Sequence, residues 1–338
     1  MAKRPTLADV AARSGLSKTA VSLILNERPG SRLSAEAVEK VRTAAADLGY
    51  RPNPAAQSLR MGKTRTIGFV SDEVTITRFA SAMIRGVLDT ADQHEHTVLI
   101  SETGRESKRT ASALDAMLDR RADGIIFGLM GAKQIDVPPV SPEVPVVLLN
   151  ASSDTGESTV LPDEETAGHA IGRVLLDHGH RRIALLGDWP SAMVDPRVSA
   201  TVALRFAGLD RAFAEFGATP VYRGTIVPWE PAPAYEAAVA LLDSGVEFTA
   251  AICLNDRIAF ALYQALQERG LRIPDDVSVV SFDDDEIADY LRPGLTTARI
   301  PYEQMGRDAV DILLGGGAPQ HRLVPMPLIE RQSVRAVP

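Results

Sequence analysis

Long apolar segments and cysteine are both scarce in this chain. No run of eighteen apolar residues occurs, which argues against a membrane-spanning helix. The N-terminus, from Met1 to Thr6, leads into polar residues instead of an apolar export segment, so we expect a cytoplasmic protein. A single cysteine, Cys253, excludes an intramolecular disulfide framework and a cysteine-cluster metal site, and we expect it to be buried filler at a strand end.

Signatures of catalysis are missing as well. No Gly-x-Ser-x-Gly elbow occurs, and no Gly-x-Gly-x-x-Gly follows a predicted strand. The segment Gly62-Lys63-Thr64 has Gln57 where a phosphate-binding loop has its first glycine. Two histidine pairs have the spacing of metal ligands, His94 with His96 and His178 with His180. Turn and packing roles suit their surroundings better, and we therefore expect no enzyme, no cofactor and no bound metal.

Charge is distributed unevenly along the 338 residues. Residues 1 to 65 carry twelve Lys or Arg against five Asp or Glu, a net charge of +7, whereas the rest of the chain carries −15. A basic end on an acidic body is expected when that end meets a polyanion such as DNA, although a solvated basic arm has the same charge. The length, with 45% hydrophobic residues, allows two full domains and a small third.

The basic end has the pattern of three short helices. Thr6-Leu7-Ala8-Asp9 has the form of a capping box that begins the first helix. Ser14-Gly15-Leu16 interrupts it, and Ser17 can cap a second helix, whose apolar side carries Val21, Ile24 and Leu25. A third helix is expected over residues 34–48. Two short helices joined by a glycine turn form a helix-turn-helix unit, whose second helix enters the DNA major groove, although a plain helical bundle has the same periodicity.

Four stretches of this end resemble the LacI/GalR (lactose-repressor type) family of transcription regulators: Thr6–Ala11, Ser17–Ser22, Leu48–Asn53 and Ala56–Arg60. The resemblance implies that Lys18 and Thr19 read base edges and that Leu59, in a hinge helix, wedges into the minor groove. Well-known members have Arg or His where Leu23 stands, so base preference at that position should rest on apolar contact. The implied DNA contacts are Thr6, Ser17, Lys18, Thr19, Ser22, Leu23, Asn26, Ala56, Leu59 and Arg60.

The acidic body alternates short apolar runs with segments of helical period. The runs are Ile67–Val70, Val98–Ile100, Gly124–Phe127, Val144–Leu149, Ile183–Leu186, Ala250–Leu254 and Val277–Ser281. This alternation predicts an α/β body of doubly wound parallel sheets in two lobes. The family resemblance continues through this body, and it implies the two-lobed fold of periplasmic sugar-binding proteins with three chain crossings between the lobes.

The expected domains follow from these patterns. They are a helix-turn-helix domain at 1–50, a hinge helix and linker at 51–65, and an effector-binding and dimerisation domain at 66–338. Within the last, lobe 1 is expected at about 66–160 and 290–320, and lobe 2 at about 161–289 and 321–338. No leucine heptad closes the chain, so a C-terminal coiled-coil tetramer is not expected.

Polar residues follow several predicted strands, and parallel sheets bind ligands outside the carboxyl ends of their strands. The candidates found in this way are Arg78, Phe79, Asn150, Asn255, Asp256 and Asp283. The family resemblance adds Thr201, Arg205 and Trp229. Hydroxyl-binding carboxylates, a planar guanidinium and flat aromatic faces suit a sugar or a related polar metabolite in the cleft between the lobes.

Each of these side chains has a purely structural alternative. Arg205 can anchor a helix by an ion pair, and Trp229 can belong to the core. Asp283 begins the acidic run Asp283–Glu286, which suits a solvated turn or a helix N-terminus. Arg78 can point to solvent, and if it faces the cleft it favours an anionic effector.

Together these features predict a sequence-specific DNA-binding transcription regulator. We expect a repressor that binds a pseudo-palindromic operator as a homodimer, without membrane contact, and whose operator affinity is controlled by a small polar effector. Two alternatives stay open: an activator, and a solute-binding protein of the periplasmic type without DNA function. The effector, the operator sequence and the direction of control are not specified by the sequence.

Overall fold

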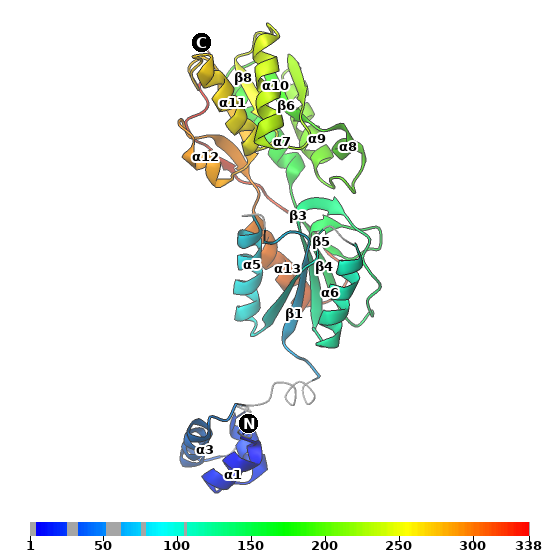
Figure 1. Cartoon of the computed structure of the whole chain (residues 1–338), viewed down its shortest axis with the longest axis vertical. Helices are drawn as coiled ribbons and strands as arrows, with labels where there is room; N and C mark the ends of the chain where they lie inside the picture. Colours follow the sequence, from blue (N-terminus) through cyan, green and yellow to red (C-terminus); the bar gives the residue numbers. More distant parts are fainter. Residues whose placement is uncertain (1–4, 26–32, 52–61, 76–78, 105–106, 338) are drawn as a thin grey trace. The chain divides into compact units, whose positions relative to one another are not determined.

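The computed structural model describes residues 5–25, 33–51, 62–75, 79–104 and 107–337. It divides into two compact units, the head Met1–Arg65 and the body Thr66–Pro338 (Figure 1). The segment 52–61, which contains the predicted hinge helix, lies outside the described residues. None of the described helices combines the length and the apolar character that a bilayer crossing requires.

The head contains the three predicted helices, α1 (Leu7–Ser14), α2 (Lys18–Leu25) and α3 (Ala35–Leu48). The predicted capping box begins α1, because Thr6 Oγ1 accepts from the Asp9 N–H and the Asp9 carboxylate accepts from the Thr6 N–H at 2.7 Å. Gly15 ends α1 with φ of 70°, a left-handed conformation that glycine adopts without strain. The helices close around a small apolar core of Val10, Ala11, Val21, Ile24, Val41, Ala44 and Ala45.

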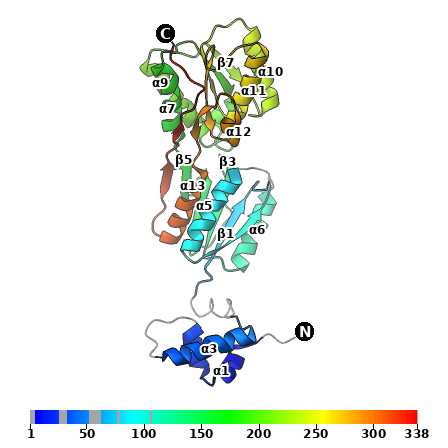
Figure 2. The same cartoon turned by 90° about the vertical axis from the view of Figure 1, so that its left-hand side faces the viewer.

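The body has two six-stranded sheets, one in each lobe (Figures 1 and 2). In lobe 1 the strand order is β11-β5-β4-β3-β1-β2, and every recorded pairing is parallel. Its strands are β1 (Thr66–Ser71), β2 (Thr97–Glu102), β3 (Gly124–Gln134), β4 (Val146–Ser152), β5 (Ser158–Pro162) and β11 (His321–Val324). In lobe 2 the order is β12-β10-β9-β8-β6-β7, and only the β10–β12 pairing among the described strands is antiparallel. Its strands are β6 (Ile183–Asp188), β7 (Tyr222–Thr225), β8 (Ala250–Cys253), β9 (Ser278–Asp283), β10 (Thr296–Arg299) and β12 (Leu328–Ile329).

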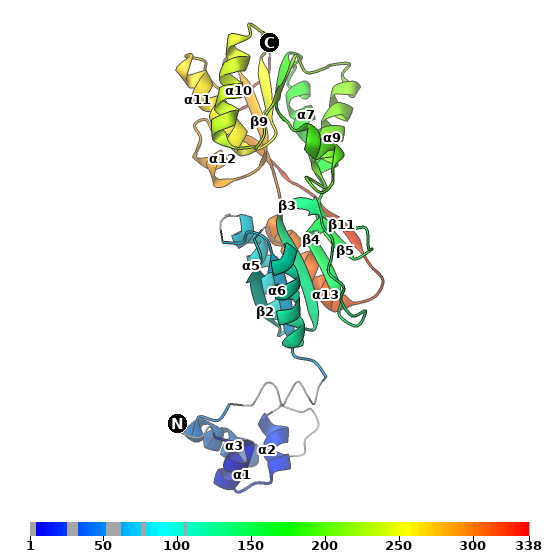
Figure 3. The same cartoon turned by 45° about the vertical axis from the view of Figure 1, so that its right-hand side comes forward.

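Helices cover both faces of each sheet, as expected for buried parallel strands (Figure 3). In lobe 1, α5 (Phe79–Gln93) and α13 (Tyr302–Gly315) pack over one face, where Phe69 points, and α6 (Ser107–Asp119) covers the face of Val70. In lobe 2, α7 (Glu164–Asp177) and α9 (Val202–Glu215) cover one face, and α10 (Pro231–Asp243) and α11 (Asp256–Glu268) cover the other. The short helices α8 (Pro190–Val194) and α12 (Glu286–Tyr290) follow strands of lobe 2.

Glycines allow one helix pair in each lobe to approach very closely. A Cβ on Gly208 of α9 would lie 2.0 Å from the Glu165 carbonyl oxygen of α7. A Cβ on Gly306 of α13 would lie 2.4 Å from the Met83 carbonyl oxygen of α5. The close crossing in lobe 2 brings the middle of α9 beside the first turn of α7, and this places Arg205 next to Glu164.

The chain passes between the two sheets three times, after β5, after β10 and after β11, as the resemblance implied. The predicted lobe boundaries need correction, because β10 was expected in lobe 1 and β11 in lobe 2, and the sheets place them the other way round. Both strands are four residues long, and β11 reads His-Arg-Leu-Val. Such short strands carry little apolar pattern, and their pairing with distant residues decides their lobe.

Candidate DNA interface and effector site

The exposed face of α2 is the candidate DNA interface. Val21 and Ile24 point into the core of the head, whereas Lys18 and Thr19 in the first turn of α2 are exposed. Ser17 is exposed and caps α2 by accepting a hydrogen bond from the Ala20 N–H at 3.1 Å. A lysine and a threonine on the outer side of a second helix can reach phosphates and base edges.

The other predicted DNA contacts divide into two groups. Thr6 is exposed at the start of α1, and Ser22 and Leu23 are half-buried on α2. The remaining four predicted contacts, Asn26, Ala56, Leu59 and Arg60, lie outside the described residues. No DNA contact of any of these residues is tested by the structure, and all of them stay predictions.

The candidate effector site lies where strands of lobe 2 end, and Arg205 is at its centre. The guanidinium of Arg205 donates from Nε and Nη2 to the two carboxylate oxygens of Glu164, both at 2.7 Å, and each of these side chains is only 3% exposed. Nη1 of Arg205 donates to the Leu254 carbonyl oxygen. Three of the five N–H groups of the arginine are therefore held by the protein itself. The alternative of a helix-anchoring ion pair describes what this side chain does in the structure.

Aromatic rings cover the same guanidinium. It lies 4.4 Å from the ring centre of Phe282 and 5.5 Å from that of Trp229. Trp229 is half-buried, donates its indole N–H to the Gly187 carbonyl oxygen at 2.9 Å, and meets Trp189 edge to face. Trp229 thus packs against the lobe 2 core, as the structural alternative expects, and also lies beside Arg205; contact of its ring with an effector stays a prediction.

Asp283 is the most accessible charged group near Arg205. Its carboxylate lies 3.7 Å from Nη2 of Arg205, and its side chain is 17% exposed. Burial raises the pKa of Asp283 to about 6; the neighbouring negative charges of Glu164 and Asp285 add to this effect, whereas the positive charges of Arg205 and Arg257 oppose it. Two carboxylates, Glu164 and Asp283, thus share one guanidinium, which leaves an excess of negative charge.

Asn255 and Asp256 are at the N-terminus of α11, where their side chains have structural partners. The Asn255 side-chain oxygen caps α11 by accepting from the Ile258 N–H at 2.8 Å. Asp256 is 1% exposed, and its carboxylate accepts from the Asp285 N–H at 2.7 Å and from the Thr297 hydroxyl at 2.8 Å. Burial, with the charge of Asp283, raises the pKa of Asp256 well above its usual range.

Lobe 1 contributes weaker groups at its strand ends. Asn150, at the end of β4, is buried with φ of 55° and donates its side-chain amide to the Leu129 carbonyl oxygen at 2.9 Å. Phe79 begins α5 and contacts the ring of Tyr302, with 5.3 Å between ring centres. Arg78 lies outside the described residues. Thr201 belongs to lobe 2, where it is buried directly before α9.

Sequence reasoning missed three residues that border this site, Glu164, Trp189 and Tyr302. Glu164 is 41 positions from Arg205, and in the sequence it is part of an acidic helix start. Tyr302 begins α13 of lobe 1, yet burial and the charges of Asp283 and Glu164 raise the pKa of its hydroxyl. Among the described residues, no group of three or more His, Cys, Asp or Glu side chains is arranged to hold a metal ion.

A helix-turn-helix head joined to a two-lobed body with polar strand ends defines the class of DNA-binding regulators with a ligand-binding body. Residues 6–53 match the family of bacterial regulatory proteins named lacI, and residues 173–334 match a periplasmic binding protein-like domain. This chain belongs to the LacI family, and it is a DNA-binding transcription regulator.

Three relatives illustrate the similarity. The chain is 31% identical to the HTH-type transcriptional repressor PurR of Vibrio atlanticus (strain LGP32), over 91% of each chain. It is 28% identical to the ribose operon repressor of Escherichia coli (strain K12), over 98% of this chain and 97% of the relative. The lac repressor dimer bound to operator and the anti-inducer ONPF superposes with a TM-score of 0.79 at 28% identity, over 99% of this chain and 100% of that chain.

Proposed function

We propose that the protein is a repressor that binds a pseudo-palindromic operator as a homodimer. Its affinity for the operator changes when a small polar metabolite binds the body. The outward-facing Lys18 and Thr19 of α2 are the observation that carries this proposal. Repressors among the relatives, and the dimeric lac repressor on its operator, support it. The protein acts in the cytoplasm, where its DNA is, and it catalyses no reaction.

The effector class follows from the charges around Arg205. An anionic effector would compete with Glu164 for the guanidinium and would approach Asp283, which already lies in an excess of negative charge. An uncharged, hydroxyl-bearing effector can donate to Asp283 without either conflict. The effector is therefore an uncharged polyhydroxylated molecule of the sugar type, which binds beside Asp283 and Trp229.

The DNA-binding part is tested with the intact protein and a duplex that it selects from a random-sequence pool. Lys18→Ala should weaken binding of the selected duplex about tenfold, since one phosphate or base contact contributes about 1–3 kcal/mol. The matched control is Lys40→Ala, another exposed lysine of the head, which pairs with Glu36 on α3. Saturable binding with a steep salt dependence supports the proposal, and a protein that selects no duplex contradicts it.

The effector class has its own test. Both tryptophans of the chain, Trp189 and Trp229, border Arg205 or its neighbours, so their fluorescence reports binding at this site. Ribose, glucose and galactose are compared with their phosphorylated forms. A saturable response to a neutral sugar that Asp283→Ala abolishes, with operator affinity retained, supports the proposal. A response to a sugar phosphate but not to its neutral parent contradicts the proposed class.

A further inference from the structure

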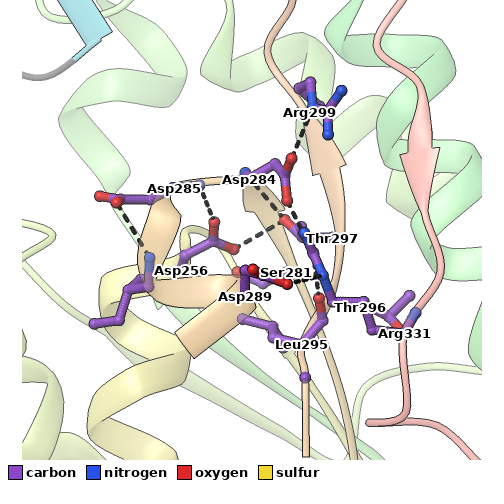
Figure 4. A network of polar contacts seen from close by, with 12 residues as sticks. Asp256, Ser281, Asp284, Asp285, Asp289, Leu295, Thr296, Thr297, Arg299 and Arg331 are labelled. Carbon is purple, nitrogen blue, oxygen red and sulfur yellow. Dashed lines mark hydrogen bonds and ion pairs between the residues drawn. The ribbon is translucent and has the colours of Figure 1, made fainter. Parts of the chain in front are cut away.

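The loop Asp283–Asp285 contacts residues in or near two of the three segments through which the chain passes between the lobes. These crossings are residue 163 between β5 and α7, residues 300–301 between β10 and α13, and residues 325–327 between β11 and β12. The loop follows β9, so its first residue is the candidate effector ligand Asp283. Figure 4 shows the polar contacts that surround it.

Asp284 joins the loop to two of the crossings. Its carboxylate pairs with Nε of Arg299 at 2.7 Å and with Nη1 of Arg331 at 2.8 Å, and the side chain is only 7% exposed (Figure 4). Arg299 is the last residue of β10, directly before the second crossing. Arg331 lies two residues beyond β12, just after the third crossing. One buried carboxylate thus holds the residue directly before the second crossing and a residue that follows β12, the strand after the third crossing.

Backbone hydrogen bonds connect the crossings with the loop and with each other. The Ile300 N–H, in the second crossing, donates to the Asp283 carbonyl oxygen at 3.3 Å. The Arg299 N–H donates to the Pro327 carbonyl oxygen at 2.9 Å, which ties the second crossing to the third. The Asp163 N–H donates to the Val324 carbonyl oxygen at 2.9 Å, which ties the first crossing to the third. Hydrogen bonds therefore link the loop directly to the second crossing, and through it to the third crossing and the first.

The loop holds a strained shape that its surroundings enforce. Asp283 and Asp284 have φ angles of 102° and 53°, a region that non-glycine residues rarely occupy. The Asp256 carboxylate holds the loop by accepting from the Asp285 N–H. It also accepts from the hydroxyl of Thr297, in the neighbouring strand β10. Such over-determined segments have few alternative shapes, so a ligand that moves Asp283 changes the position of Asp284.

We infer that Asp284 is a positioning residue that transmits effector occupancy at Asp283 to the lobe crossings through its ion pairs with Arg299 and Arg331. The inference rests on the proposed function, because transmission requires a body that responds to operator and effector. By linkage, operator binding to the head must alter the effector site as strongly as the effector alters operator affinity. Operator DNA is therefore a sufficient probe.

The test is hydrogen exchange of the full-length protein with and without the duplex selected by the wild type. In the wild type, operator should change the exchange rates of the amides of residues 283–285 and of Ile300 about fivefold or more, the lower end of ordinary allosteric coupling. We compare the exchange rate of each amide with operator to its rate without operator, and call the quotient the operator-dependent ratio. Asp284→Asn should reduce this operator-dependent ratio to less than about twofold. Asparagine tolerates a positive φ as well as aspartate does, so the backbone shape is preserved in the variant.

Asp289→Asn is the matched control. Asp289 also lies near Arg331, at 3.6 Å, but it is 75% exposed and outside the loop. Its substitution therefore removes one negative charge beside the same arginine and leaves the loop intact. Its operator-dependent ratio should equal that of the wild type. A merely structural role of Asp284 would speed exchange equally with and without operator and would leave the ratio unchanged.

The outcomes separate the inference from the proposed function. A wild type that selects no duplex removes the proposed function, and the inference with it. A wild type that binds operator without any change in the loop, or an Asp284→Asn variant that keeps the full ratio, overturns the inference alone. If Asp284→Asn does not fold, Arg299→Gln breaks one of the two ion pairs at a half-exposed side chain, and the same criteria apply to it.

Discussion

Lobe 1 and lobe 2 share an architecture and differ in the charges at their strand ends. Each has six strands in one sheet, and a pair of helices that cross at glycines over one face. Lobe 2 gathers Glu164, Arg205, Asp256 and Asp283 in one network of charged groups, whereas lobe 1 has Asn150 and a single pair, in which the buried Asp72 meets the partly exposed Lys133. The same fold thus supplies two scaffolds, and only one of them concentrates buried charge.

The largest expected effect comes from breaking the charged network of lobe 2. Arg205→Met leaves the Glu164 carboxylate buried without its partner, and the free energy of unfolding should fall by about 3–5 kcal/mol. Urea unfolding followed by tryptophan fluorescence measures this, because Trp189 and Trp229 both lie in lobe 2. A loss below about 1 kcal/mol would show that the pair behaves like an exposed one.

The pH dependence of lobe 2 should be set in part by Asp283. The folded protein keeps this proton up to a pKa of about 6, whereas an unfolded aspartate releases it near 3.9. The folded state therefore binds more protons between these values, and stability falls as the pH rises from about 4 to about 6. This contribution amounts to about 3 kcal/mol, at 1.36 kcal/mol for each pKa unit.

Asp283→Asn should remove that contribution. Relative to the wild type, the variant should gain stability as the pH is raised from 4 to 7, measured by urea unfolding at each pH. The wild type and variant share every other titrating group, so their difference reports Asp283 together with its effect on the neighbouring Asp256. Parallel stability curves across this range would show that Asp283 titrates at an ordinary pKa in the folded protein.

The glycine crossings test what the lobes have in common. Gly208→Ala in lobe 2 and Gly306→Ala in lobe 1 each place a Cβ against a backbone carbonyl, at 2.0 and 2.4 Å. Overpacking lowers the free energy of unfolding, and replacing glycine by alanine in a helix raises it by about 1 kcal/mol. The overpacking is larger, so each variant should lose about 2 kcal/mol of stability in total. Gly315→Ala, in the last turn of α13 and with no atom within 4 Å of the added Cβ, is the helical control for both. A neutral result in one lobe would show that the two crossings are not equivalent.

Much of this comparison could be predicted from the sequence. All seven apolar runs became strands, since buried parallel strands need continuous apolar residues. The missed strands β5, β7, β10, β11 and β12 have five residues or fewer. Their placement depends on partners far away in the chain, as when β11 pairs with β5 across about 160 residues. Local pattern carries no information about such a partner.

The candidate site was predictable in its positions and not in its partners. Strand-end reasoning located Asn255 and Asp283 because the carboxyl ends of parallel strands share one edge. That Glu164 holds the Arg205 guanidinium depends on the close glycine crossing of α7 and α9, which joins residues 41 positions apart. The pairing of Asp284 with Arg299 and Arg331 likewise depends on how the crossings fold back, which no local motif encodes.

The smallest expected effect comes from the charged pair of lobe 1. Lys133 pairs with Asp72 at 2.8 Å. The Asp72 side chain is only 9% exposed, but the lysine side chain is 34% exposed, so water reaches the pair and screens the interaction. Asp72 also accepts from the Met130 N–H at 3.1 Å, and this bond holds its carboxylate when the lysine is removed. Lys133→Met should therefore cost less than about 1 kcal/mol, measured by urea unfolding followed by circular dichroism. A loss as large as that of Arg205→Met would mean that lobe 1 depends on a charged centre of its own, and the contrast between the lobes would disappear.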